Sequence, residues 1–103
     1  MARLVKVARL DELPPGAMKT YEVEGRPVLL ANVEGSIHAM GAICTHEEWD
    51  LSEGSLEGDK VVCAGHGAVW DLTTGKAEFD EELQPNPVYR TVVKEGVIFV
   101  ELE

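Results

Sequence analysis

Cysteine and histidine side chains lie close together at two places in this sequence. The first pair is in Cys44-Thr45-His46 and the second is in Cys63-Ala64-Gly65-His66, with residues 47–62 between them. The chain has only two cysteines and three histidines, so both cysteines and two histidines fall in these pairs. Two thiolates and two imidazoles are a complete set of four metal ligands. We therefore predict a metal centre held by Cys44, His46, Cys63 and His66.

Two kinds of centre fit these ligands. A 2Fe–2S cluster can take two histidines in place of two thiolates, which makes its oxidised form neutral and easier to reduce than a four-thiolate dianion. Structural zinc also takes two cysteines and two histidines, but zinc fingers usually end in two histidines from one segment, whereas each pair here mixes the two types. A plain cysteine pair with incidental histidines is a third interpretation, and a disulfide is a fourth. The cluster is the interpretation that we favour.

Length and charge limit what the rest of the chain does. The 103 residues, of which 45% are hydrophobic, suit one globular domain. Nine basic and 19 acidic side chains give a net charge of −10, which argues against nucleic acid and is compatible with a basic protein partner. No apolar run is long enough to span a bilayer, and the N-terminal residues do not resemble a signal peptide. We expect a cytoplasmic protein that does not bind membranes.

Alternation of apolar and polar residues, broken by glycine and proline turns, predicts an all-β fold of antiparallel hairpins in a sandwich or barrel. No segment has a convincing helical pattern, and we expect residues 47–60 to form a loop. The expected strands are residues 4–8, 18–23, 26–33, 37–43, 61–63, 68–72, 76–79, 89–94 and 97–102. Both Cys/His pairs then follow strand ends and stand beside glycines, which allow tight turns and let backbone N–H groups point at sulfur.

The two pairs and the residues after them resemble the Rieske-type ferredoxins. In that family the second pair is commonly followed by glycine, an aromatic residue, aspartate and a Thr-Gly turn, as in the segment from Gly67 through Trp70 and Asp71 to Thr74-Gly75. The resemblance implies that Cys44 and Cys63 hold one iron and that His46 and His66 hold the other. It also implies a single Rieske domain over residues 1–103, in which a cluster-binding part, residues 44 to about 70, is inserted in a base part, residues 1–43 and 71–103.

Two departures from the respiratory and photosynthetic Rieske proteins bear on function. Those proteins have a disulfide near the cluster, whereas Cys44 and Cys63 are the only cysteines here. They also place a serine and a tyrosine hydroxyl against the cluster sulfurs, and the matching residues here, Ala68 and Trp70, have no hydroxyl. Each lost hydrogen bond lowers a one-electron potential by roughly 40–130 mV if it is worth ~1–3 kcal/mol. We therefore expect a low potential.

These features predict a soluble one-electron carrier, not an enzyme, with no catalytic residues of its own. Its partners would be a reductase and a terminal oxygenase or similar enzyme. The alternatives are a small Rieske-like subunit of a nitrite reductase and a zinc-stabilised interaction module.

Further expectations concern residues near the two pairs. Glu47 and Glu48 stand beside the first pair and suggest an acidic docking surface near the histidines. Trp70 is expected in the core, Trp49 beside the cluster or at the surface, and Leu51 over the cluster; His38 is not a ligand.

Overall fold

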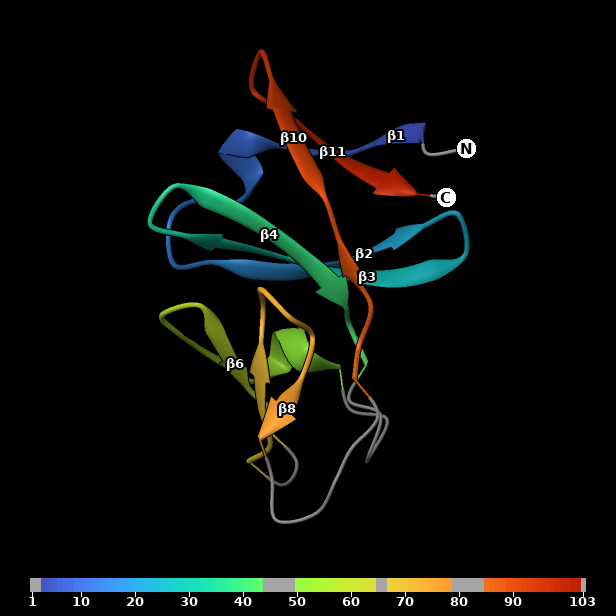
Figure 1. Cartoon of the computed structure of the whole chain (residues 1–103). Helices are drawn as coiled ribbons and strands as arrows, with labels where there is room; N and C mark the ends of the chain where they lie inside the picture. The colour runs from blue at the N-terminus through green and yellow to red at the C-terminus, as the bar shows by residue number, and fades with distance from the viewer. Residues whose placement is uncertain (1–2, 44–49, 65–66, 79–84, 103) are drawn as a thin grey trace.

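The computed structural model describes residues 3–43, 50–64, 67–78 and 85–102. Three antiparallel sheets lie one above another (Figure 1). The first contains β1 (Arg3–Arg9), β11 (Val97–Leu102) and β10 (Thr91–Lys94), in that order. The second contains β2 (Met18–Val23), β3 (Arg26–Val33), β4 (Ser36–Gly41) and β9 (Val88–Tyr89). The third contains β5 (Ser55–Glu57), β6 (Lys60–Val62), β7 (Val69–Asp71) and β8 (Ala77–Glu78).

The all-β prediction is confirmed. In the described ranges the helical segments are two single 3-10 turns, η1 (Leu10–Glu12) and η2 (Leu51–Glu53). None of the helices described is long and apolar enough to cross a membrane. The division into a base part and an inserted part stays a prediction; the third sheet itself runs past residue 70 to Glu78.

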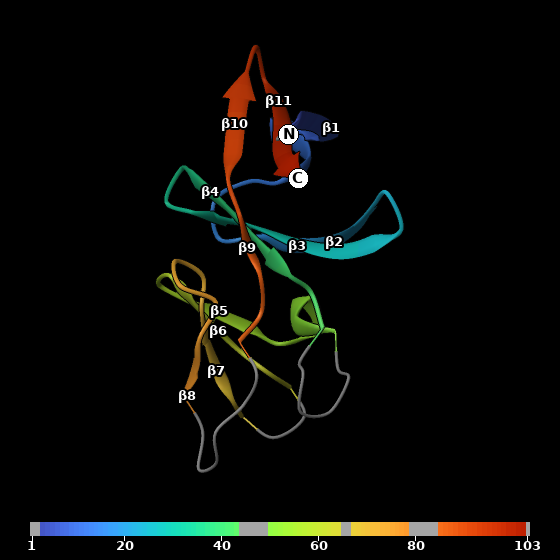
Figure 2. The same cartoon turned by 45° about the vertical axis from the view of Figure 1, so that its right-hand side comes forward.

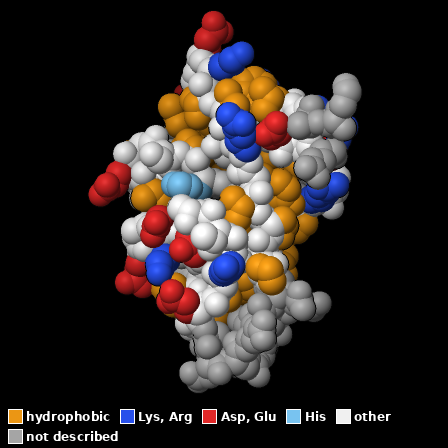
Figure 3. Space-filling view, in the orientation of Figure 1, with side chains coloured by type: hydrophobic (Ala, Val, Ile, Leu, Met, Phe, Trp, Pro, Cys, Tyr) orange, Lys and Arg blue, Asp and Glu red, His pale blue; other side chains and the backbone are white. Residues whose placement is uncertain are grey.

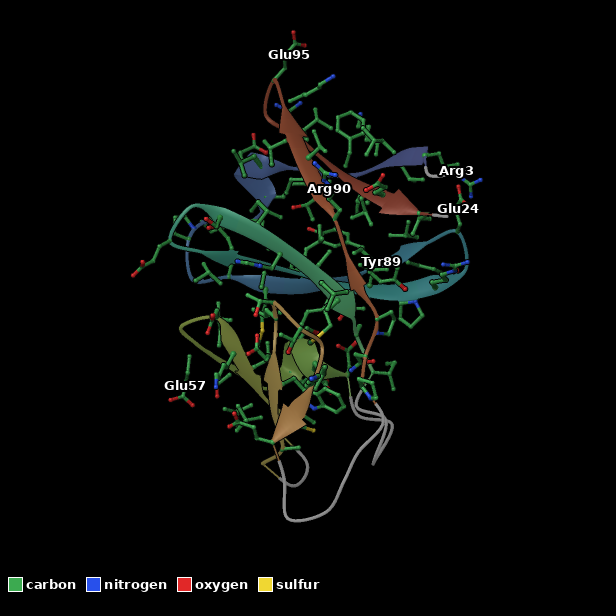
Figure 4. The ribbon with its side chains drawn as sticks, viewed as in Figure 1. Arg3, Glu24, Glu57, Tyr89, Arg90 and Glu95 are labelled. Atoms are coloured by element: carbon green, nitrogen blue, oxygen red, sulfur yellow. The ribbon has the colours of Figure 1, made fainter. Side chains whose placement is uncertain are left out.

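Three of the hairpins share one kind of turn. Glu24-Gly25 joins β2 to β3, Glu34-Gly35 joins β3 to β4, and Glu95-Gly96 joins β10 to β11. All six residues have positive φ, with values of 50° to 51° at the glutamates. Such two-residue turns match the right-handed twist of the strands that they connect. At the first turn, Glu24 also pairs with Arg3 of β1, which joins the first two sheets at their edges (Figure 4).

The middle sheet is covered on both faces (Figure 2). Val28 and Leu30 of β3 point into a core shared with the first sheet, which also contains Ile98 and Val100. The alternate residues of β3, Leu29 and Ala31, point into a second core against the third sheet. This explains why β3 has five consecutive buried residues rather than an alternating pattern. We call the second of these the lower core, and it is the one next to the Cys/His pairs.

Two predicted elements differ in the structure. Residues 51–59, predicted as loop, contain η2 and β5, because the backbone of Ser55–Glu57 pairs with Lys60–Val62 despite its weak hydrophobic pattern. The strand predicted at 89–94 is two strands: β9 pairs with β4, and β10 pairs with β11. The chain leaves one sheet for the other at Arg90, next to Tyr89 in Figure 4. The backbone oxygen of Arg90 accepts from the N–H of Glu101, at 2.8 Å, in the first sheet.

Candidate metal centre

The ends of the first ligand segment are held together by backbone pairing. Ile43 and Asp50 form an isolated antiparallel bridge. Beside it, the N–H of Leu51 donates to the carbonyl oxygen of Ala42 at 2.7 Å. Cys44, His46, Glu47, Glu48 and Trp49 lie between these two ends and outside the described residues. The described backbone therefore shows a closed base from which the segment with Cys44 and His46 begins and ends.

Asp50 ties this base to the middle sheet. One carboxylate oxygen, Oδ1, accepts from the hydroxyl of Thr20 in β2 at 2.5 Å. The same oxygen accepts from the N–H of Ser52 at 2.9 Å and from its hydroxyl at 2.7 Å, so Asp50 also caps η2. Burial by itself would raise the pKa of Asp50, but these hydrogen bonds outweigh it and hold the pKa below its usual value. The ionised carboxylate is therefore the form that fixes the loop.

The second ligand segment is a turn closed on Cys63. The N–H of Cys63 donates to the oxygen of Ala68 at 2.8 Å, and the N–H of Gly67 donates to the oxygen of Cys63 at 3.1 Å. Gly67 has a φ of +76°, which a residue with a side chain rarely adopts. Its N–H is used in closing the turn. The expectation that backbone N–H groups beside the Cys/His pairs point at sulfur stays a prediction. Gly65 and His66 lie outside the described residues.

Both segments begin from the lower core. Ala42 and Leu51 come from the base of the first segment, and Cys63 and Ala68 from the base of the second; all four are buried in that one core with Trp70. Cys63 is 2% exposed and Trp70 is fully buried, as predicted for this tryptophan. The described ends of the two segments therefore belong to one core, although residues 47–62 separate the Cys/His pairs in sequence.

A third segment, 85–87, packs against the same region. The N–H of Gly41 donates to the oxygen of Pro87 at 2.9 Å, and the N–H of Asn86 donates to the oxygen of Gly75 at 2.8 Å. A Cβ on Gly75 would lie 2.0 Å from the backbone oxygen of Asn86. A Cβ on Gly41 would lie 2.7 Å from the side-chain oxygen Oδ1 of the same residue. The two glycines therefore let the buried Asn86 come close to the ends of β4 and the β7–β8 turn.

The described surroundings of Cys63 suit a sulfur-rich group. The indole Nε1–H of Trp70 is buried in the same core and has no hydrogen-bond partner among the described groups. A buried donor of this kind normally has an acceptor, which can be a group that the protein binds. The donor set of two cysteines and two histidines is that of a mixed 2Fe–2S cluster, although of its four members the structure describes Cys63 alone. Where the other three lie stays a prediction.

Sequence reasoning did not find the supporting residues. Asp50 and Ser52 have the spacing of a capping pair, which was a usable signal in the sequence. The link from Asp50 to Thr20 was not, because thirty residues separate them.

An all-β fold with two Cys/His segments on one core defines the class: an iron–sulfur protein of the Rieske type. The family model for the Rieske [2Fe-2S] domain matches residues 3–93, and the chain belongs to this family. Its cofactor is a Rieske 2Fe–2S cluster.

Three comparisons place the chain within this class. It is 35% identical over 100 residues to the ferredoxin component of biphenyl 2,3-dioxygenase from Rhodococcus jostii (strain RHA1), covering 97% of this chain and 94% of that one. It is 31% identical, with a TM-score of 0.84, to a chain in the solved complex of reduced oxygenase and oxidised ferredoxin in carbazole 1,9a-dioxygenase, over 94% and 91% of the two chains. A putative NADH-dependent nitrite reductase small subunit from Mycobacterium tuberculosis has a TM-score of 0.88 at 24% identity, over 100% and 97%.

The last likeness shows the fold alone. The first two show that the chain is an electron carrier of the ferredoxin type rather than a catalytic enzyme.

Proposed function

We propose that this chain carries single electrons from a reductase to the terminal oxygenase of a dioxygenase system, with Cys44 and Cys63 on one iron and His46 and His66 on the other. The observation that carries the proposal is the near full-length likeness to a dioxygenase ferredoxin component, together with both Cys/His pairs. The bound cluster supplies one-electron oxidation and reduction. We also propose that the protein works in the cytoplasm.

The residues of the chain serve the cluster by position and by exclusion of water. Leu51, Ala68 and Trp70 form an apolar wall on the core side of Cys63. Asp50 and the turn closed on Cys63 hold the two ligand segments at fixed points of one core. Since the core occupies the inner side, the ligand histidines are the side chains that we expect to face a docked partner. One-electron transfer needs only this close approach and no substrate pocket.

An optical and low-temperature EPR spectrum of the purified protein, before and after dithionite, tests the cofactor and its ligands. We expect a red-brown protein that is EPR-silent when oxidised and rhombic when reduced. Cys63→Ser and His66→Ala each remove a proposed ligand and should abolish this signal. His38→Ala is the matched control, because it removes the remaining histidine and should leave the signal unchanged. A colourless wild-type protein that holds one zinc would refute the proposal and leave a zinc-stabilised interaction module.

A subunit role in a nitrite reductase is the other alternative. The fold is compatible with it, but a likeness at 24% identity does not extend to function. Purification under native conditions distinguishes the two, because a carrier elutes alone at high salt whereas a subunit stays with its large partner.

A further inference from the structure

The indole nitrogen of Trp70 is a buried donor of the lower core that lacks a described partner. Trp70 Nε1, Tyr21 Oη and Asn86 Nδ2 are the three buried side-chain atoms without a hydrogen-bond partner in the described part of the chain. Tyr21 packs against the core between the first and middle sheets, and Asn86 belongs to the segment 85–87. Only Trp70 is a member of the same buried core as Cys63. Of the three atoms, Trp70 Nε1 is therefore the one whose hydrogen-bond partner could be the cluster.

The strand register places the indole on the same face as Cys63. Trp70 pairs with Val61, and Val69 pairs with Val62. The next pair toward the turn is Cys63 with Ala68, joined by the 2.8 Å hydrogen bond. Residues two apart along a strand share a face, so Trp70 and Cys63 are diagonal neighbours. In an antiparallel pair such neighbours are roughly 7–8 Å apart, a distance that an aromatic side chain can span.

The energetics require an acceptor for this N–H. A buried donor without a partner costs about 1–3 kcal/mol, and a site with no water and low polarity makes the cost larger. The buried hydrophobic residues of the lower core offer this N–H no side-chain acceptor other than the sulfur of Cys63, and Trp70 Nε1 has no partner among the described groups. The acceptors that the bound cluster brings are the sulfur atoms of its cysteines and its sulfides.

We propose that the Nε1–H of Trp70 donates a hydrogen bond to a sulfur atom of the cluster and raises its reduction potential. Reduction adds negative charge that the sulfurs share, so the hydrogen bond is stronger in the reduced state and favours it. Position 70 then supplies a nitrogen donor where the respiratory and photosynthetic proteins supply a hydroxyl. The inference rests on the proposed function, because it needs the cluster that Cys63 helps to hold.

The test removes the N–H without changing the shape of the ring. In a Trp49→Phe background, the remaining tryptophan is replaced by the analogue in which sulfur stands for the indole N–H. The reduction potential of the holoprotein is then measured by spectroelectrochemistry against the same background with ordinary tryptophan. We expect the equilibrium with the mediator to shift about tenfold toward the oxidised protein, which is 59 mV for one electron. Trp70→Phe, a variant that ordinary expression supplies, should shift it in the same direction.

Val61→Ala is the matched control, because it leaves a cavity in the same core and removes no donor. We expect it to lower the melting temperature with no change of potential. A potential in the analogue protein that moves no further than in Val61→Ala would overturn the inference.

A second measurement does not depend on stability. Protein labelled with [15N]indole in the Trp49→Phe background should show a 15N hyperfine coupling to the reduced cluster by pulsed EPR, and the absence of this coupling would also overturn the inference. If the wild-type protein gave no rhombic signal at all, it is the proposed function that would fail.

Discussion

Gly54 packs closely against the backbone of β6, just before the second ligand segment. A Cβ at this position would lie 1.9 Å from the carbonyl oxygen of Val62, the residue before Cys63. We predict that Gly54→Ala destabilises the protein by about 2 kcal/mol, because a backbone atom of β6 has to move, and overpacking costs of this order are typical. Since the shift occurs next to Cys63, the variant should also hold less iron per chain. Urea unfolding and iron analysis of the purified protein measure both effects.

Gly58→Ala is the control for this prediction. Gly58 has a φ of +62° and nothing within 4 Å of the added Cβ, so alanine there costs only backbone strain, about 1 kcal/mol. Its iron content should equal that of the wild type. Equal iron loss in both variants would mean that general destabilisation, and not the contact with β6, governs cluster binding.

At the level of single residues, the proposed metal ligands could be predicted from the sequence, but the residues that let the surrounding backbone pack closely could not. Cys44, His46, Cys63 and His66 stand out because thiol and imidazole groups are rare and their spacing is specific. Gly54 and Gly75 look like ordinary turn glycines in the sequence. Because they lack a Cβ, they avoid a collision with the backbone oxygens of Val62 and Asn86. Only the folded arrangement brings these oxygens near.

The segment of η2 and the base of the first ligand segment depend on one charge. The pKa of Asp50 is lowered in the folded state, so its contribution to stability is complete above the unfolded pKa, near about 4, and is lost as pH falls through the folded pKa. We predict that Asp50→Asn costs about 1–2 kcal/mol at pH 7 and that its difference from wild type shrinks toward zero at lower pH. Urea unfolding of the holoprotein from pH 7 to pH 3 measures this difference.

Thr20→Val tests the same link from the other side. It removes the hydroxyl that donates to Asp50 Oδ1, so the pKa of Asp50 should rise and the loss of stability should begin at a higher pH. A difference between Asp50→Asn and wild type that persists unchanged at pH 3 would contradict this view of the carboxylate.

A substitution in a Glu-Gly hairpin turn can increase the stability of the protein. Glutamate at a φ of 51° is strained, whereas asparagine is favoured at the first position of this turn type. We predict that Glu95→Asn stabilises the β10–β11 hairpin by about 0.5 kcal/mol and raises Tm by about 2–4 °C. Glu95→Gln is the control, because it removes the same charge without the backbone preference, and it should leave Tm near the wild-type value. An equal rise in both would assign the effect to charge.

At the level of elements, hairpins with short turns were predictable and changes of sheet were not. The strands at 18–23 and 26–33 were predicted at the bounds that β2 and β3 have, since both alternation and turn residues are local signals. The break at Arg90 has no such signal, because Tyr89 to Lys94 reads as one run of β-forming residues. What divides it is pairing with two partners, β4 and β11, that are distant in sequence.

On the scale of the molecule, the net charge of −10 is spread unevenly. Over the third sheet, acidic and basic side chains are interspersed (Figure 3), and Lys60 pairs with Glu78 at 3.3 Å. The hydrogen bond from Lys60 to Glu78 raises the pKa of Lys60. Glu47 and Glu48, outside the described residues, adjoin a proposed ligand histidine and have no basic neighbour in the segment between Cys44 and Asp50. They are the acids that we expect to steer a basic partner toward the cluster.

We predict that reversing both, Glu47→Lys with Glu48→Lys, slows electron transfer from a basic reductase about tenfold at low salt, because steered association depends on such charges. The difference should disappear at high ionic strength, where charges beyond about 10 Å are screened. Stopped-flow reduction at several salt concentrations measures the rate and its salt slope.

The matched control for this reversal is Glu34→Lys with Glu95→Lys, which changes the net charge equally. Glu95 lies at the tip of the β10–β11 hairpin, at the end of the molecule opposite the third sheet (Figure 4). If local charge guides docking, this control keeps most of the wild-type rate at low salt. Equal slowing by both pairs would mean that only the total charge matters, and an unchanged rate and salt slope in the first pair would remove Glu47 and Glu48 from the docking surface.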